Sequence, residues 1–224
     1  MRIVVSIGGS VLTSDLDPER IQKYAESIEQ IAKDHTVYVI VGGGRSAREY
    51  IETARALGAN HAKCDIIGID MTRINARLLI VALGSRAYPE PATSYPEATE
   101  AALTGQIVVM GGLIPGQTTD AVSAVLAEYV GADLLINATS VDGVYTADPN
   151  TDYNAVKIET MTPAQLIDVV MKIDLVAGSN SPLDILAAKI IQRCGIKTIV
   201  IDGRDPNNIT EAVAGRHSGT LISS

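Results

Sequence analysis

Short aliphatic runs alternate along this chain with longer segments in which apolar residues recur at helical spacing. The runs that we expect to be strands are Arg2–Ile7, Thr36–Val41, Gln106–Met110, Asp133–Ala138, Lys197–Asp202 and Thr220–Ile222. Most are nearly continuous in Val and Ile, which is typical of parallel strands that are covered on both faces. The pattern predicts an α/β fold, a three-layer αβα sandwich with a mainly parallel central sheet.

The segments between these strands have the spacing and the end signals of helices. The expected helices are Pro18–Ala32, Arg45–Leu57, Cys64–Leu83, Thr93–Leu103, Thr119–Tyr129, Thr162–Val170 and Pro182–Cys194. Asp17 is a plausible N-cap for the first, with Pro18 at the first helical position. With 224 residues and 46% hydrophobic content, we expect one domain over residues 1–224.

Composition excludes some classes of function. A net charge of -8 argues against a nucleic-acid surface, which needs a basic face. No apolar run is long enough to span a bilayer, and the sequence begins with a strand pattern, so we expect neither membrane insertion nor a signal peptide. Cys64 and Cys194 have no metal-site spacing and read as ordinary thiols of a reducing cytoplasm.

Three expected strands end in glycine-rich loops. These loops are Gly8-Gly9-Ser10, Gly42-Gly43-Gly44 and the segment from Gly111 to Asp120. In parallel sheets, ligands bind beyond the carboxyl ends of the strands. Glycines let a backbone approach a ligand closely, and helix N-termini attract anions. Three such loops therefore predict two phosphorylated ligands bound side by side.

Each loop also has a plain structural explanation. Gly8-Gly9-Ser10 is equally well a tight turn or a phosphate nest, and its spacing matches neither the dinucleotide fingerprint nor the P-loop. Arg48 follows the triple glycine by one helical turn and could reach a phosphate, or it could pair with Glu49 or Glu52. The triple glycine favours the phosphate.

The loop from Ile114 to Asp120 is the strongest candidate. Thr118 and Thr119 offer hydroxyl donors, and helix capping accounts for only one of its polar residues. Asp65 is explained either as an N-cap or as a carboxylate for a sugar hydroxyl, and the sequence favours the cap. Arg73 and Arg77, one helical turn apart, read as surface or subunit-contact residues.

Two further segments remain ambiguous. The run from Asn137 to Pro149 is packed with turn formers and could be a hairpin or an adenine and ribose pocket, of which spacing favours the hairpin. Residues 177–182 read as a mobile connection, with a functional lid as the alternative. His35, His61 and His217 are scattered, and no nucleophile system is recognisable.

The assembled motifs resemble the uridylate kinases of the amino-acid-kinase superfamily, in particular the archaeal branch. The resemblance rests on Ile7-Gly8-Gly9-Ser10, Val41-Gly42-Gly43-Gly44 with Arg48, Asp65-x-x-Gly68, Pro115-Gly116-x-Thr118-Thr119-Asp120, Val141-Asp142-Gly143-Val144-Tyr145-Thr146-Ala147-Asp148-Pro149 and Asp184-x-x-Ala187-Ala188-Lys189. The two longest motifs are the most specific, and the resemblance covers nearly the whole chain.

The resemblance implies a role for each motif. ATP phosphates would be held by Gly9, Ser10, Gly44 and Arg48, and adenine with its ribose by Thr139, Tyr145 and Asp148. UMP would be bound by Gly43, Asp65, Ile114, Pro115, Gly116, Gln117, Thr118, Thr119 and Asp120. The acceptor side would thus fall within about residues 1–130 and the ATP side within about 131–224. The resemblance also implies magnesium with ATP, a cytoplasmic homohexamer built from dimers, and a place in pyrimidine nucleotide synthesis.

One position departs from the family pattern. Many relatives carry lysine two residues before the first glycine pair, where this chain has Ser6. The charge of the transferring phosphate must then be met otherwise, and Arg48, Lys189 and the metal are the candidates. Asp120 would either bind UMP or orient the neighbouring donors. We therefore assign catalytic roles to Arg48, Asp120 and Lys189, and no protein ligand to the metal.

The expected reaction is transfer of a phosphoryl group from MgATP to UMP. The acceptor phosphate has a second pKa of roughly 6 and needs no general base at neutral pH. Three alternatives remain: a kinase of the same superfamily for isopentenyl phosphate or an amino acid, a non-catalytic nucleotide-binding regulator, and an NAD-dependent enzyme. The Thr-Thr-Asp loop argues against the first, Ser6 makes the second plausible, and the missing glycine fingerprint disfavours the third.

Overall fold

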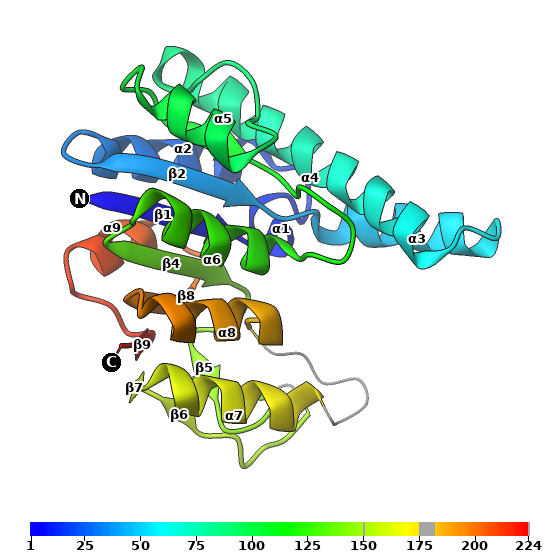
Figure 1. Ribbon diagram of the computed structural model, residues 1–224, viewed down its shortest axis with the longest axis vertical. Coiled ribbons are helices and arrows are strands. Elements are labelled where there is room, and N and C mark those ends of the chain that lie inside the picture. Colours follow the sequence, from blue (N-terminus) through cyan, green and yellow to red (C-terminus); the bar gives the residue numbers. More distant parts are fainter. Residues whose placement is uncertain (150, 175–181, 224) are drawn as a thin grey trace.

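One seven-stranded sheet runs through the centre of the protein (Figure 1). The computed structural model describes residues 1–149, 151–174 and 182–223. The strands lie in the order β3-β2-β1-β4-β8-β9-β7. Their bounds are β1 Arg2–Ile7, β2 Thr36–Val41, β3 Val108–Met110, β4 Leu134–Thr139, β7 Thr160–Met161, β8 Thr198–Asp202 and β9 Thr220–Ile222. Neighbouring strands are parallel except β8 and β9, so the predicted αβα sandwich with a mainly parallel sheet is confirmed.

Helices cover both faces of this sheet. The described helices are α1 Gly9–Leu12, α2 Pro18–Ala32, α3 Gly44–Ala56, α4 His61–Leu83, the 3-10 turn Gly84–Arg86, α5 Tyr95–Ala102, α6 Thr119–Val130, α7 Pro163–Asp174, α8 Ile185–Cys194 and α9 Asn207–Val213. Every helix that the sequence predicts is present, with ends shifted by a few residues. The short helices α1 and α9 and the strand β7 were not predicted.

The alternation of side chains along the central strands creates two cores. Ile3, Val5 and Ile7 of β1 pack with α2, α4 and α9 on one face. Val4 of the same strand faces the other way, into a core made with α5, α6, α7 and α8. Because both faces are buried, β1 needs apolar residues at successive positions, which is the pattern seen in the sequence.

Helix caps fix the approach of the chain to the site. Asp17 accepts a hydrogen bond from the Glu19 amide at the start of α2, as predicted. The start of α4 corrects a prediction: Asn60, not Asp65, is the N-cap, and its side chain accepts from the Lys63 amide at 3.0 Å. The helix begins one turn earlier than expected, so the Asp65 carboxylate is released for another partner.

Two regions lie outside the sheet itself. Helices α3 and α4 pack on each other and form an arm that extends past the carboxyl ends of the strands (Figure 1). The segment after β4 forms an antiparallel ribbon of β5 Val144–Tyr145 and β6 Lys157–Ile158, so the first strand of the predicted hairpin lies within the expected run and its partner strand lies beyond it. Most of the predicted connection over residues 177–182 lies outside the described residues. Within the described ranges, no helix is both long and apolar enough to cross a membrane.

Candidate active site

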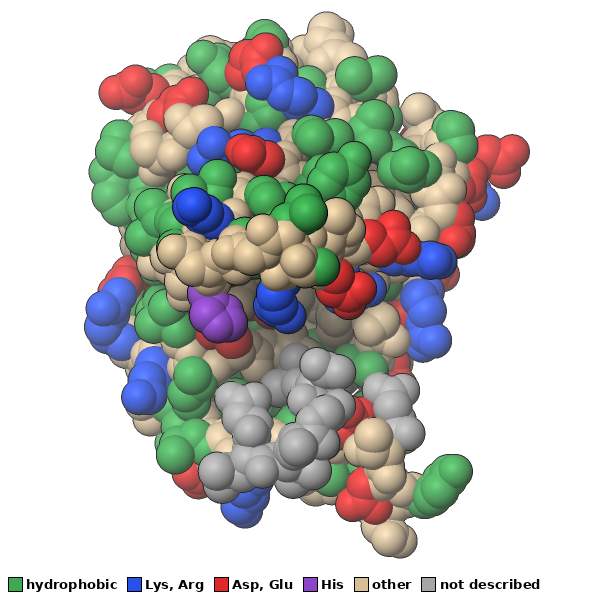
Figure 2. Space-filling model, turned by 90° about the vertical axis from the view of Figure 1, so that its right-hand side faces the viewer, with side chains coloured by type: hydrophobic (Ala, Val, Ile, Leu, Met, Phe, Trp, Pro, Cys, Tyr) green, Lys and Arg blue, Asp and Glu red, His purple; other side chains and the backbone are tan. Residues whose placement is uncertain are grey.

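The three glycine loops meet at the carboxyl end of the sheet, as predicted. This end lies at the right of Figure 1, and Figure 2 faces it and shows the surface hollowed there, with acidic and basic side chains beside the hollow. A large cavity with a volume of about 500 Å³ opens on this side. Its lining comes from α3, α4 and the loop before α6: Gly43, Gly44, Ala47, Arg48, Ile51, Asp65, Gly68, Ile69, Thr72, Gly112, Gly116, Gln117, Thr118 and Thr119.

The loops that follow β1 and β2 are packed backbone to backbone. A Cβ on Gly9 would overlap the Gly44 amide nitrogen and lie 2.5 Å from the Gly42 carbonyl oxygen. Gly44 itself has φ +67, a conformation that favours glycine. Glycine is therefore required on both sides of this contact. The structure brings together Gly9 and Gly44, two residues assigned to the ATP phosphates.

The loop before α6 closes the acceptor side of the cavity. The Gly116 amide donates to Asp65 Oδ2 at 2.9 Å, which ties this loop to α4. Asp65 thus holds the Gly116 backbone, a role that the sequence did not predict. Of the remaining residues assigned to UMP, Gln117, Thr118 and Thr119 line the cavity. Ile114 and Pro115 are exposed on the loop and do not belong to the described lining.

Two helices begin at this site and are joined through their caps. Thr118 caps α6, since the Ala121 amide donates to its hydroxyl oxygen at 3.1 Å. The Thr118 hydroxyl in turn donates to Asp184. Asp184 caps α8 by accepting from the Leu186 and Ala187 amides at 2.7 and 2.9 Å. The N-termini of α6 and α8, both favourable to anions, therefore point toward one region.

Asp120 lies beneath this pair of caps and has a perturbed acidity. Burial, together with the negative charge of Asp184, raises the pKa of Asp120 to about 7, although a hydrogen bond from Ser6 at 3.3 Å acts in the opposite direction. A group that changes charge near neutral pH, beside two helix N-termini, is typical of a functional site. Asp184 belongs to one of the sequence motifs, but no role was predicted for it. The expected helix began at Pro182, whereas in the structure Asp184 is its N-cap.

Arg48 is the one cation among the described residues that line the large cavity. The sequence left open whether Arg48 binds a phosphate or forms an ion pair with Glu49 or Glu52. In the structure Glu49 forms an ion pair with Arg45, whose Nε lies 2.7 Å from Glu49 Oε1. No described carboxylate forms an ion pair with Arg48. Its guanidinium is therefore free for an anionic ligand. Lys189 is exposed on α8 and lines none of the described cavities at this end, so its catalytic role remains a prediction.

The residues expected around adenine are distributed over a neighbouring region. A second cavity of about 240 Å³ is lined by Thr146, Ala147, Asp148, Thr151, Asp152, Lys172 and Ile173. Asp148 is thus placed at a cavity, while Thr139 ends β4 and the Tyr145 hydroxyl donates to Asp142 Oδ1 at 2.7 Å. Neither Thr139 nor Tyr145 belongs to the described lining of this cavity. Ser10 is the second residue of α1, beside Gly9.

Comparison with known proteins decides the family. A model of the amino acid kinase family matches residues 1–202. The chain belongs to this family. Within it, the chain belongs with the uridylate kinases: it is 55% identical to that of Methanosarcina mazei over 215 residues, covering 96% of this chain and 92% of the relative. It is 56% identical to the uridylate kinase of Halorubrum lacusprofundi over 224 residues, covering 99% and 93% of the two chains.

Solved structures of this family have the same fold. The crystal structure of uridylate kinase from Archaeoglobus fulgidus has a TM-score of 0.92 and 49% identity, and the match covers 100% of both chains. UMP kinase from Ureaplasma parvum has a TM-score of 0.82 at 25% identity, covering 100% of this chain and 99% of the other. The resemblance that the sequence motifs indicate is confirmed.

Proposed function

We propose that this protein is a nucleoside monophosphate kinase that transfers the γ-phosphoryl group of ATP to UMP, giving UDP and ADP. The observation that carries this proposal is the cavity itself, where the triple-glycine loop and Arg48 face the Gly116-Gln117-Thr118-Thr119 loop. Its volume of about 500 Å³ suits a nucleotide, since ligand pockets span roughly 300–1,000 Å³. The chain is also 55% and 56% identical to two uridylate kinases, over almost the full length of both partners in each comparison.

The site supports phosphoryl transfer by alignment and charge neutralisation. The acceptor phosphate, with a pKa of roughly 6, is already mostly a dianion and needs no general base. Two anions repel each other, so the site must hold both and neutralise the charge that develops between them. Backbone amides at Gly9 and Gly44, the helix N-termini and Arg48 supply that neutralisation. Asp65 and Asp184 fix the loops that carry these groups.

Magnesium is proposed to enter with ATP. Among the described residues, no three of the side chains His, Cys, Asp and Glu converge on one point. Magnesium often needs only one or two carboxylates besides phosphate oxygens and water, so the carboxylate pair Asp120 and Asp184 fits this chemistry. The ion would supply charge neutralisation for the triphosphate. A cation beside the pair would also relieve the mutual repulsion that raises the pKa of Asp120.

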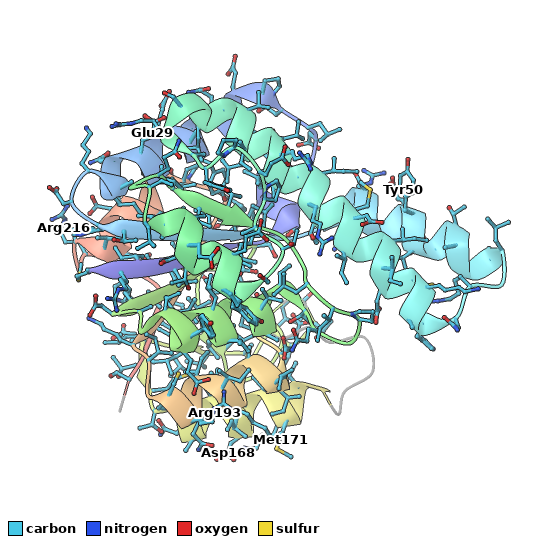
Figure 3. All side chains as sticks on the ribbon, turned by 45° about the horizontal axis from the view of Figure 1, so that its top comes forward. Glu29, Tyr50, Asp168, Met171, Arg193 and Arg216 are labelled. Atoms are coloured by element: carbon cyan, nitrogen blue, oxygen red, sulfur yellow. The ribbon has the colours of Figure 1, made fainter. Side chains whose placement is uncertain are left out.

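We also propose that the protein assembles as a homohexamer of dimers in the cytoplasm and serves pyrimidine nucleotide synthesis. In support of assembly, Ile74, Leu78 and Val81 form an exposed apolar stripe on α4, with 50%, 36% and 78% of their surfaces accessible. Tyr50 is exposed on the same α3–α4 arm, away from the sheet (Figure 3). Both cysteines are free thiols, which suits a reducing compartment.

The decisive experiment measures ADP release from ATP with UMP, CMP, AMP, isopentenyl phosphate and amino acids as acceptors, with and without magnesium. We expect turnover with UMP well above that with the other acceptors, and dependence on magnesium. Binding of ATP without turnover of any acceptor would instead support a regulator, for which Ser6 remains the motivating observation. Turnover with another acceptor alone would contradict the assignment of the Thr118–Thr119 loop to UMP.

A further inference from the structure

The face of α4 that packs toward the sheet carries two buried polar side chains that neither the sequence motifs nor the proposed mechanism uses. Thr72 and Asn75 are 7% and 2% exposed, and they lie three residues apart on one side of the helix. Buried polar groups cost free energy unless they are hydrogen-bonded, so their partners show what they are for.

Asn75 binds the loop that follows β2. Its Nδ2 donates to the Gly42 carbonyl oxygen at 2.9 Å and to the Gly43 carbonyl oxygen at 3.1 Å. In a trans peptide the C=O and the next N–H point in opposite directions. Holding both carbonyls toward α4 therefore turns the Gly43 and Gly44 amides away from the helix. These two glycines line the large cavity.

Thr72 binds the loop that follows β3. Its hydroxyl donates to the Ile69 carbonyl oxygen at 2.6 Å and accepts from the Gly112 amide at 2.7 Å. The loop crosses directly over this side chain, since a Cβ on Gly111 would lie 2.5 Å from Thr72 Oγ1. Thr72 and Gly112 both line the large cavity.

We propose that Thr72 and Asn75 are positioning residues that set the spacing between the two glycine loops across the active-site cavity. The proposal rests on the proposed function, because it assigns the Gly112 loop to the acceptor and the Gly43–Gly44 loop to both nucleotides. Each loop is anchored to the same helix within one turn, so α4 fixes the distance between them. The hydroxyl of Thr72 orients the acceptor loop, and the amide of Asn75 orients the phosphate loop.

The two positions predict different kinetic effects. Thr72→Val keeps the branched outline of the side chain but leaves the Gly112 amide without its acceptor. We expect a rise of about tenfold in the KM for UMP, while the KM for ATP stays within about twofold. Thr72→Ser keeps the hydroxyl and should return the KM for UMP to within about threefold of the original. Asn75→Leu, which has a similar outline without donors, should raise both KM values.

Thr198→Val provides the matched control. Thr198 is 0% exposed, and its hydroxyl also donates to a main-chain carbonyl, that of Ile196 at 3.2 Å. It lies at the amino end of β8, opposite the end where the cavity opens. Its substitution should lower thermal stability without changing either KM. Melting shifts produced by UMP and by ATP give a second readout that does not depend on turnover.

The outcomes are distinguishable. The inference would be overturned if Thr72→Val left the KM for UMP unchanged, or if it raised the KM for UMP and the KM for ATP in parallel. Failure of Thr72→Ser to restore UMP binding would also overturn it. If Thr72→Val does not fold, Thr72→Ala repeats the comparison; loss of folding in both would show that the hydroxyl serves the fold. Failure of the unsubstituted protein to form UDP would refute the proposed function instead.

Discussion

The Ser6 hydroxyl donates a hydrogen bond to Asp120 Oδ1 across 3.3 Å, linking β1 to the first turn of α6. Ser6 stands where the resemblance to the family leads us to expect lysine, so a neutral donor faces the carboxylate of Asp120. Burial and the charge of Asp184 raise the pKa of Asp120 to about 7, against the opposing effect of this hydrogen bond.

This acidity predicts how stability depends on pH. The folded pKa of Asp120 lies above its ordinary value of 3.8, so the folded state binds the proton more tightly than the unfolded state. The contribution of Asp120 to the free energy of unfolding is therefore fully present at low pH. It declines as the pH rises from about 4 to about 7 and is lost above that range. Asp120→Asn should raise the melting temperature above pH 7 by an amount that vanishes near pH 4. Thermal unfolding across this range checks it.

The matched control for this substitution is Asp168→Asn. Asp168 is exposed on α7, on the outer side of the molecule (Figure 3). Its substitution should leave the pH dependence of unfolding unchanged. An Asp120→Asn protein whose stability falls in parallel with the unsubstituted protein at every pH would contradict the raised pKa.

Arg48 should dominate the electrostatics of the cavity. Among the described lining residues it carries the one positive charge, and no described carboxylate neutralises it. Arg48→Ala should lower kcat/KM by roughly 50-fold, since a hydrogen bond to a charged group is lost. Arg48→Lys should recover only part of this, because a point charge cannot make two parallel bonds. Steady-state kinetics with ATP and UMP varied in turn measures both effects.

Arg45→Ala is the control for Arg48. Arg45 lies on the same helix and is occupied by Glu49 in an exposed ion pair. Such pairs contribute little to stability, so the fold and the kinetics should both be retained. Equal losses for the two arginines would indicate a general charge effect and not a specific contact.

Thr119 should contribute to the binding of UMP and not to that of ATP. It lines the large cavity from the first position of α6, and its side chain is not needed as the cap because Thr118 has that role. Thr119→Ala should raise the KM for UMP by about tenfold and leave the KM for ATP nearly unchanged. Thr99→Ala, on the exposed face of α5, is a control. Equal effects on UMP and ATP would reject the assignment of this loop to the acceptor.

The sequence predicted the fold well because its signals are local. Continuous aliphatic runs identified β1, β2 and β9 with their observed ends, and the Asp17-Pro18 pair identified the start of α2. Misses occurred where local signals conflict or are short. The glycines of α1 read as a turn, and β7 has only two residues. At the start of α4 the sequence favoured Asp65 as the cap, but the structure gives this role to Asn60, which was not considered.

The site was predictable only in part, for a topological reason. Parallel strands place their carboxyl ends together, so loops at those ends could be assigned to one site from the sequence. Contacts across large sequence separations gave no such signal. The partner of Thr72 is 40 residues away along the chain, and that of Asp184 is 66 residues away. Polar residues at positions where the helical spacing expects the buried face of α4, such as Thr72 and Asn75, were the available clue.

The adjacent glycines Gly8 and Gly9, in the loop after β1, should differ sharply in how far alanine substitution destabilises the fold. A Cβ on Gly9 would overlap the Gly44 amide and lie 2.5 Å from the Gly42 carbonyl oxygen, and backbone atoms cannot move aside. A Cβ on Gly8 would meet its nearest atom, the Ala138 carbonyl oxygen, at 3.5 Å, an ordinary contact. Gly9→Ala should therefore lower the free energy of unfolding by about 3 kcal/mol or more, and Gly8→Ala by less than about 1 kcal/mol. Urea unfolding of the two variants compares them directly, and similar losses would contradict the close packing of the two loops.

The apolar stripe on α4 predicts the surface through which subunits of the proposed oligomer would associate. Val81 is 78% exposed, and together with Ile74 and Leu78 it presents a continuous apolar face at helical spacing. Val81→Glu places a charge in that face and should shift the protein toward smaller species, as measured by light scattering during size-exclusion chromatography over a dilution series. Leu103→Glu is the control, because Leu103 is 84% exposed but lies at the end of α5, outside the stripe. If only the Leu103 variant dissociates, the contact surface lies elsewhere; if both elute with the unsubstituted protein, α4 does not hold the subunits together.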